Sequence, residues 1–220
     1  MLAWYRPDGA PQVIAHQKEF VQRIGQACLR YDIPFIFELL LYAFPGSSSH
    51  TTDYVEDPVK RADHVVESVA TFAAPEYGVD LFKLESPLPA ATIPDKSGDD
   101  GRVQALFDQL GTAAARPWVM LSAGATQDAF RRVLHYAYAA GASGYLAGRA
   151  IWWDAGQAFP DLTAMRGALV INSVPYMQSL NRMTDELATP WTASTGTLGP
   201  AELANAGPGF RSDYASLVPE

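Results

Sequence analysis

The sequence predicts an α/β fold built from repeated strand–helix units. Short apolar runs alternate with segments of helical periodicity, at a spacing of roughly 30 to 45 residues. Two of these runs, FIFELLLY and WVML, are apolar nearly throughout, which is typical of strands covered on both faces of a parallel sheet. With 220 residues, 48% of them hydrophobic, the chain can form one domain with a substantial core. A doubly wound sheet and a (β/α)8 barrel both fit this pattern.

Local signals predict the elements in chain order. Asp57 followed by Pro58 is typical of a helix start, with a capping side chain and then proline at the first helical position. After Pro190 the composition shifts to small residues, and we expect a domain over 1–191 followed by a loosely packed tail over 192–220. The predicted strands are 2–5, 34–42, 79–85, 118–122 and 144–147, and the predicted helical segments are 11–31, 57–73, 102–112, 126–139 and 151–187.

The composition argues against several classes of protein. The net charge is −8 and no stretch is strongly basic, which disfavours a nucleic-acid partner. The apolar runs fall far short of the roughly 20 residues that a membrane span needs, and the first residues lack the pattern of a signal peptide. The only cysteine, Cys28, rules out an internal disulfide and fits a reducing compartment. We therefore expect a cytoplasmic protein.

Lys83 is the residue that most strongly indicates chemistry, because it lies within an apolar run, VDLFKLE. A buried amine is either tightly paired or held partly neutral, and a neutral amine can attack a carbonyl to form a Schiff base. Strand alternation predicts that Glu38 and Lys83 point to one site near the carboxyl ends of neighbouring strands. A structural ion pair explains the pattern equally well. Glu85, on the same face as Lys83, either tunes the lysine or caps the strand end.

Two glycine-containing turns follow successive strands and open helices, at 121–126 and 146–149. Such turns expose backbone N–H groups at a helix N-terminus, where anions bind, and barrels often bind phosphate at their last two loops. The guanidinium of Arg149 suits a phosphate or sulfonate group. Trp152 and Trp153, directly afterwards, are expected to pack their helix against the sheet. The candidate anion-binding residues are Ser122, Ala123, Gly124, Gly148 and Arg149.

The segments VDLFKLESP, PWVMLSAGAT, GYLAGRAIW and NRMTDELATPW resemble class I tagatose-1,6-bisphosphate aldolases and the related sulfofructose-phosphate aldolases. The resemblance covers about residues 2–191. It implies a (β/α)8 barrel, with Lys83 as the Schiff-base lysine and Glu38 as the acid/base. It further implies that the candidate anion-binding residues hold the phosphate nearest the ketose carbonyl.

The resemblance also implies that the barrel is incomplete. A (β/α)8 domain takes about 250 residues, and the segment LAWY near the start of this chain matches the family's fourth strand. Three or so N-terminal βα units are therefore expected to be missing, including a lysine that the family carries just before this point. An exposed apolar sheet edge favours self-association, so we expect a homo-oligomer, and weak or no activity from the chain alone.

The implied reaction is aldol cleavage of tagatose 1,6-bisphosphate to dihydroxyacetone phosphate and glyceraldehyde 3-phosphate. It needs no cofactor and no metal, and the four histidines, His16, His50, His64 and His135, are scattered along the chain. Two alternatives stay open: an aldolase for a sulfosugar phosphate or an inositol-derived keto acid phosphate, and a non-catalytic module that binds sugar phosphates. A dinucleotide-binding domain lacks support, because no G-x-G-x-x-G follows the first strand.

Overall fold

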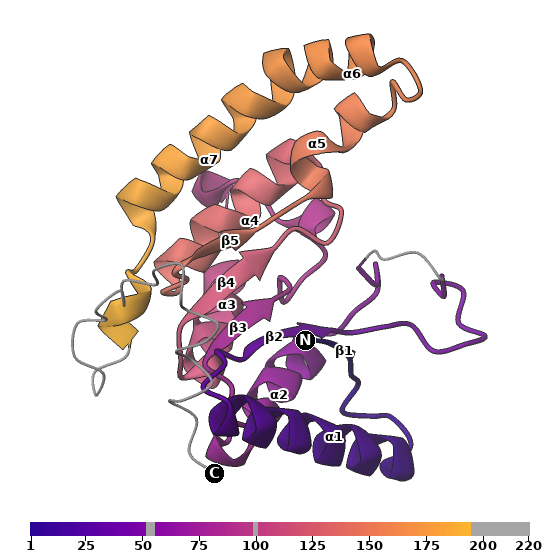
Figure 1. Ribbon diagram of the computed structural model, residues 1–220, viewed down its shortest axis with the longest axis vertical. Helices are drawn as coiled ribbons and strands as arrows, with labels where there is room; N and C mark the ends of the chain where they lie inside the picture. The colour runs from indigo at the N-terminus through magenta and orange to yellow at the C-terminus, as the bar shows by residue number, and fades with distance from the viewer. Residues whose placement is uncertain (52–55, 99–100, 195–220) are drawn as a thin grey trace, which may run out of the picture.

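Five parallel strands in chain order form the sheet of the computed structural model, which describes residues 1–51, 56–98 and 101–194 (Figure 1). Each strand pairs with the next one along the chain, so β1 and β5 are the two edges of this sheet. The strands are β1 Leu2–Trp4, β2 Ile36–Leu40, β3 Leu81–Leu84, β4 Trp118–Leu121 and β5 Gly144–Leu146.

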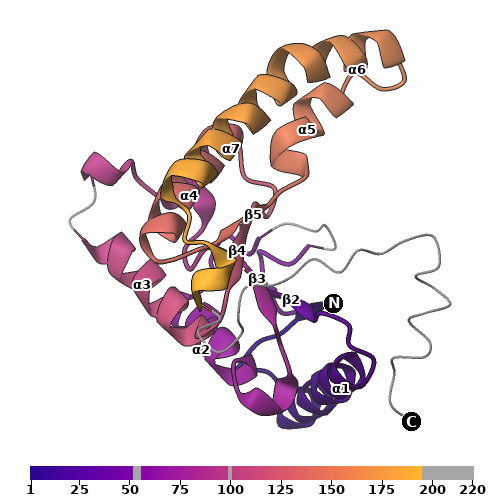
Figure 2. The same cartoon turned by 60° about the vertical axis from the view of Figure 1, so that its left-hand side comes forward.

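Helices follow every strand, as the sequence predicts. They are α1 Pro11–Arg30, α2 Ala62–Phe72, α3 Arg102–Ala114, α4 Gln127–Ala139, α5 Arg149–Gly156, α6 Leu162–Ala168 and α7 Val174–Leu187. A π-helical turn, Leu169–Ser173, joins α6 to α7, and short 3-10 turns lie at Pro75–Tyr77, Ala90–Thr92, Lys96–Gly98 and Trp191–Ser194. Helices α5 and α6 project beyond the sheet, and α7 runs back alongside α4 (Figures 1 and 2). Within the described residues, no helix combines the length and the apolar character that a membrane span requires.

The strand order decides between the two folds that the sequence allows. A doubly wound sheet reverses its strand order at a switch point and carries helices on both faces. Here the order runs from β1 to β5 without reversal, which is the connectivity of a (β/α)8 barrel wall. The fold is therefore of the barrel type, with five βα units in the described part of the chain.

The core lies between the sheet and helices α1 to α4. Phe37, Phe82 and Met120 point to this side from β2, β3 and β4 and are each 0% exposed. The ring of Phe37 packs edge-on against Phe72 of α2, with the ring centroids 5.1 Å apart. Such aromatic pairs contribute about 0.5–1.5 kcal/mol beyond their buried area.

The opposite face of the sheet is partly open, so the expectation of strands covered on both faces fails at some positions, although Leu40 and Leu121 on that face are 3% exposed. Ile36 of β2 is 43% exposed and Leu146 of β5 is 45% exposed. In a closed barrel this face would line the interior and would be filled by side chains from other strands. The five described strands curve around one side of that space only, which leaves apolar side chains in contact with solvent.

Two local expectations are also corrected. Helix α2 begins at Ala62 rather than at Asp57, because the Asp57 carboxylate caps a separate turn by accepting a hydrogen bond from the Val59 N–H (3.1 Å). The expected packing of Trp152 and Trp153 against the sheet is wrong as well. They are 44% and 51% exposed, on the part of the molecule that projects beyond the sheet.

Gly25 marks a close approach between α1 and the turn Pro75–Tyr77 and gives a direct test of this packing. A Cβ atom there would lie 1.9 Å from the Tyr77 carbonyl oxygen, which is backbone and cannot move aside cheaply. We expect Gly25→Ala to lower the free energy of unfolding by about 1–3 kcal/mol. Gly167→Ala in α6 is the matched control, since no atom lies within 4 Å of its added Cβ. The control should stabilise the helix by about 0.5–1 kcal/mol. Denaturant titrations that rank the two variants the other way would contradict this packing.

Candidate functional site

Glu38 and Lys83 lie side by side on the open face of the sheet. The parallel register of β2 and β3 pairs Glu38 directly with Lys83, and the Lys83 Nζ donates a hydrogen bond to the Glu38 Oε2 at 2.8 Å. The two side chains are 23% and 14% exposed. The amine is thus held in place yet reachable from the open side.

The geometry suits proton transfer combined with nucleophilic attack. A carboxylate within hydrogen-bonding distance of an amine can accept and return protons as the amine reacts. A nucleophile with an adjacent base at 2.6–3.2 Å is the general arrangement of covalent catalysis. The pair also satisfies the definition of an ion pair, so the structure alone is consistent with both interpretations of these residues.

Glu85 binds Leu41 and Lys60. The sequence left open whether this residue tunes Lys83 or caps the strand end. Its side chain is turned into a buried network, where its Oε1 accepts a hydrogen bond from the Leu41 N–H (2.6 Å) and its Oε2 accepts one from the Lys60 Nζ (2.9 Å). The Lys60 ammonium also donates to the Glu56 Oε2 at 2.8 Å. Of the two interpretations offered by the sequence, the strand-end cap describes Glu85.

Burial and charge oppose one another in this network. Burial would lower the pKa of Lys60, but the carboxylates of Glu85 and Glu56 outweigh it and raise that pKa. Burial raises the pKa of Glu85, against the opposing effect of Lys60. Because the pKa of Lys60 is higher than in the unfolded chain, where it is about 10.4, its contribution to folding stability is present at neutral pH. It is lost only as the pH rises through the folded-state value.

Comparison of the four lysines singles out Lys83 as the candidate nucleophile. Lys60 is 0% exposed in its side chain and is held by two carboxylates, so it cannot reach a substrate as a neutral amine. Lys18 lies on helix α1, and Lys96 is exposed in a 3-10 turn. Only Lys83 is on the open face of the sheet, with an acid/base partner in contact.

The first glycine turn follows β4, the neighbour of the strand that carries Lys83. The Ala125 N–H closes the turn on the Ser122 carbonyl oxygen at 2.8 Å. Its two central residues, Ala123 and Gly124, have φ angles of 46° and 80°, in the left-handed region that glycine favours. Thr126 then caps helix α4, accepting a hydrogen bond from the Ala129 N–H. The turn therefore delivers backbone N–H groups to the carboxyl end of the sheet.

The second glycine turn meets the first. A Cβ added at Gly124 would lie 3.6 Å from Nη2 of Arg149, so the guanidinium rests against the first turn. A Cβ at Gly148 would lie 3.3 Å from the indole Nε1 of Trp152. The structure thus brings Gly124 and Arg149 together, as expected. It also places the indole N–H of Trp152 near this site, whereas the sequence pattern indicated only a packing role for this residue.

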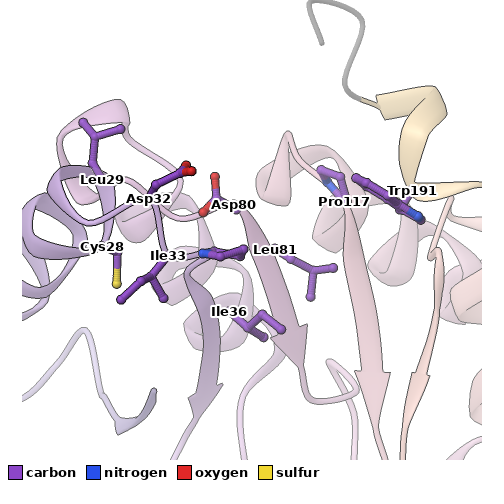
Figure 3. Close-up of a pocket in the computed structure, with 10 residues that line it drawn as sticks. Cys28, Leu29, Asp32, Ile33, Ile36, Asp80, Leu81, Pro117 and Trp191 are labelled. Carbon is purple, nitrogen blue, oxygen red and sulfur yellow. The ribbon is translucent and has the colours of Figure 1, made fainter. Parts of the chain in front are cut away.

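The structure contains two hollows, one beside the second glycine turn and one at the opposite end of the sheet. One, of about 600 Å³, runs between β5 and α7 and is lined by Val119, Leu146 and Met177 among others. The other, of about 510 Å³, lies at the start of β2 and β3, where Asp32 and Asp80 point towards each other (Figure 3). That end is opposite the one at which barrel active sites are built, and it contains none of the candidate residues.

Metal-binding side chains do not gather in the structure. Among residues 1–51, 56–98 and 101–194, no group of three or more His, Cys, Asp or Glu side chains could hold a metal ion.

The site thus combines a lysine on a barrel strand, an adjacent carboxylate and two small-residue turns at the same end of the sheet. Residues 1–154 match the family model described as "DeoC/LacD family aldolase". The chain therefore belongs to the DeoC/LacD family of class I aldolases, which confirms the resemblance seen in the sequence motifs.

Several curated tagatose 1,6-diphosphate aldolases are similar to this chain. Aldolase 1 of Streptococcus pyogenes serotype M1 is 32% identical over 203 residues, 87% of this chain and 61% of that protein. Aldolase 2 of Streptococcus mutans serotype c is 28% identical, over 87% of this chain and 60% of that protein. The tagatose 1,6-diphosphate aldolase of Listeria monocytogenes serotype 4b is 30% identical, over 90% of this chain and 60% of that protein. The chain thus spans about three fifths of the length of these relatives.

A solved structure of a Schiff-base-forming fructose-1,6-bisphosphate aldolase matches 78% of this chain and 53% of its own, with 19% identity and a TM-score of 0.47.

Lysine accessibility gives a test of the site geometry that needs no substrate. We expect an amine-directed acylating reagent to modify Lys83 in the folded protein and to leave Lys60 unmodified, because Lys60 is fully buried and protonated. Peptide mass spectrometry would report the modified fraction at each lysine, with the exposed Lys96 as internal reference. Modification of Lys60 at the rate of Lys96 would show that the buried network is not formed in solution.

Proposed function

We propose that the protein is a class I aldolase, which cleaves a ketose bisphosphate such as tagatose 1,6-bisphosphate to dihydroxyacetone phosphate and glyceraldehyde 3-phosphate. The observation that carries this proposal is the Glu38–Lys83 contact of 2.8 Å on the accessible face of the sheet. Family membership and the names of the similar curated proteins support the reaction type and the choice of sugar.

In this proposal Lys83 is the nucleophile. Its neutral amine attacks the C2 carbonyl of the ketose, and loss of water from the resulting carbinolamine leaves a cationic iminium. A base removes the proton of the C4 hydroxyl, the C3–C4 bond breaks, and its electron pair moves to the iminium to form an enamine. The aldehyde product departs. Protonation of the enamine at C3 and hydrolysis then release dihydroxyacetone phosphate and restore Lys83.

Glu38 is the proton carrier for these steps in our proposal. It accepts a proton as the Lys83 amine adds to the carbonyl and returns one to the departing hydroxyl of the carbinolamine. Its contact with the Lys83 nitrogen makes it the described carboxylate best placed to serve this atom. Glu85 is unsuitable, because its oxygens are committed to Leu41 and Lys60.

The two glycine turns are proposed to hold the phosphate on the C1 side of the ketose. Ser122, Ala123 and Gly124 would supply backbone N–H groups, while Gly148 admits the anion closely and Arg149 offers charged donors. The contact of the Arg149 guanidinium with Gly124 supports a single shared cradle. Strand order supports its placement, because β4 and β5 follow the strand that carries Lys83.

Two alternatives remain: an aldolase for a substrate that differs at the end far from the C1 phosphate, and a non-catalytic module. A sulfosugar phosphate or an inositol-derived keto acid phosphate would use the same amine and the same cradle. A non-catalytic sugar-phosphate module would use the cradle alone. We further propose a cytoplasmic homo-oligomer, supported by the metabolic role of the family and by the exposed apolar side chains of the open sheet face.

Covalent trapping tests the proposed nucleophile. Incubation with dihydroxyacetone phosphate and borohydride should add one reduced adduct, located by peptide mapping to Lys83. Lys83→Ala should abolish the adduct, and Glu38→Gln should slow its formation by about 10²-fold or more, the usual contribution of acid–base catalysis. Lys96→Ala serves as the matched lysine control. Binding of the phosphate ligand without any adduct would favour the non-catalytic module, and an adduct that persists in Lys83→Ala would remove Lys83 from its role.

The anion cradle is tested separately from the chemistry. Arg149→Ala should raise the concentration of dihydroxyacetone phosphate that gives half-maximal trapping by about tenfold, since a charge-assisted contact contributes roughly 1.5–3 kcal/mol. The trapping rate at saturation should change far less. Arg166→Ala, an exposed arginine on α6, should leave both values unchanged. Equal half-maximal concentrations for Arg149→Ala and the unaltered protein would show that Arg149 does not hold the phosphate.

A further inference from the structure

Lys60 is a buried charge that the proposed chemistry leaves unused. Its side chain is 0% exposed, and its ammonium lies 2.8 Å from the Glu56 Oε2 and 2.9 Å from the Glu85 Oε2. An ion buried to this degree loses its hydration, which its partners only partly restore. Buried ion pairs are often no more stabilising than apolar residues of the same shape, so their value lies in the geometry that they impose.

The Lys60 network connects the ends of two strands with the two loops beside them. Glu85 directly follows β3, and its second oxygen accepts the Leu41 N–H at the end of β2. Glu56 lies in the connection between β2 and α2, and its second oxygen accepts the Ala90 N–H from the loop after β3 at 2.8 Å. Lys60 is the only residue that contacts both carboxylates in these bonds. Lys60 thus joins the two halves of the network across the rim of the sheet.

The two anchored strand ends are those that carry the reacting pair. Glu85 lies two residues beyond Lys83, and Leu41 lies three residues beyond Glu38. Fixing both ends fixes the relative position of the two strands where the amine and the carboxylate must meet. The network is built on the bonds of Lys60 to Glu56 and Glu85, whereas the reacting pair is joined by the bond between Lys83 and Glu38.

We propose that Lys60 is a positioning residue for Glu38 and Lys83, which acts by tying the ends of β2 and β3 to the two loops beside them. This inference rests on the proposed aldolase function for its kinetic consequence, but the tether itself is a structural claim that can be tested alone. Small displacements of a reacting pair are expensive, since about 1 Å of misplacement can lower a rate by about 10²-fold.

The test uses a variant that removes the tether together with the buried Glu85 charge and leaves only the Glu56 carboxylate, whose side chain is 16% exposed, without Lys60. Lys60→Met alone isolates a buried carboxylate and is expected to destabilise the fold. The double variant Lys60→Met with Glu85→Gln removes both charges, while the glutamine oxygen can still accept the Leu41 N–H. Arg61→Met is the matched control, because Arg61 neighbours Lys60 in the chain but forms an exposed ion pair with Asp63, with the side chains 65% and 60% exposed.

Borohydride trapping and thermal denaturation are measured together. We expect the double variant to recover most of the thermal stability lost in Lys60→Met, yet to trap dihydroxyacetone phosphate at least about tenfold more slowly at saturation. The half-maximal ligand concentration should stay unchanged, because the anion cradle follows β4 and β5. Arg61→Met should match the unaltered protein in every value. A stable double variant that traps at the unaltered rate would overturn the positioning role.

Hydrogen exchange keeps the two proposals distinguishable. If the unaltered protein forms no adduct, the proposed function fails, and the tether is then judged by exchange at the Ala90 amide, whose acceptor Glu56 is held by Lys60. Faster exchange at Ala90 in the double variant than in Arg61→Met supports the tether. Equal exchange in the two variants overturns it.

Discussion

The parallel register between β2 and β3 is the constraint on which the site depends. It pairs Glu38 with Lys83 and places both side chains on the face that the helices leave open. Because side chains alternate along a strand, a slip of one residue in either strand would turn its ionisable group into the core beside Phe37 or Phe82. The apolar side chains on the helical face therefore fix the register, and through it the chemistry.

Around this pair, the two faces of the sheet have opposite characters. The helical face is sealed by aromatic and aliphatic side chains, whereas the other face exposes Ile36 and Leu146 to solvent. The rim between them is held by charges, with Lys60 linking Glu85 to Glu56. Dispersion and desolvation stabilise the core, and hydrogen-bonded charges stabilise the rim. The amine of Lys83 is the part that stays accessible to solvent.

Local patterns were enough to predict the strands, the helices and the pairing of Glu38 with Lys83. Strand alternation and small-residue turns depend only on residues that are close together in the chain. The Lys60 network was not predicted, since its bonded members lie 4 to 44 residues apart and carry no periodicity. The false helix start at Asp57 has the same origin, a polar side chain satisfied by a turn rather than by a helix. The exposure of one sheet face depends on which other strands are present. The apolar character of a single strand does not indicate whether other strands cover it.

The exposure of Lys83 has a consequence for the lifetime of any covalent intermediate. An iminium on a side chain that is 23% exposed stands in contact with bulk water, which can return it to the ketose before the carbon–carbon bond breaks. Partitioning between hydrolysis and cleavage would then be set by how much of the open face is covered, rather than by the strength of the nucleophile. In the proposed reaction, a covering layer on this face would thus control commitment to cleavage.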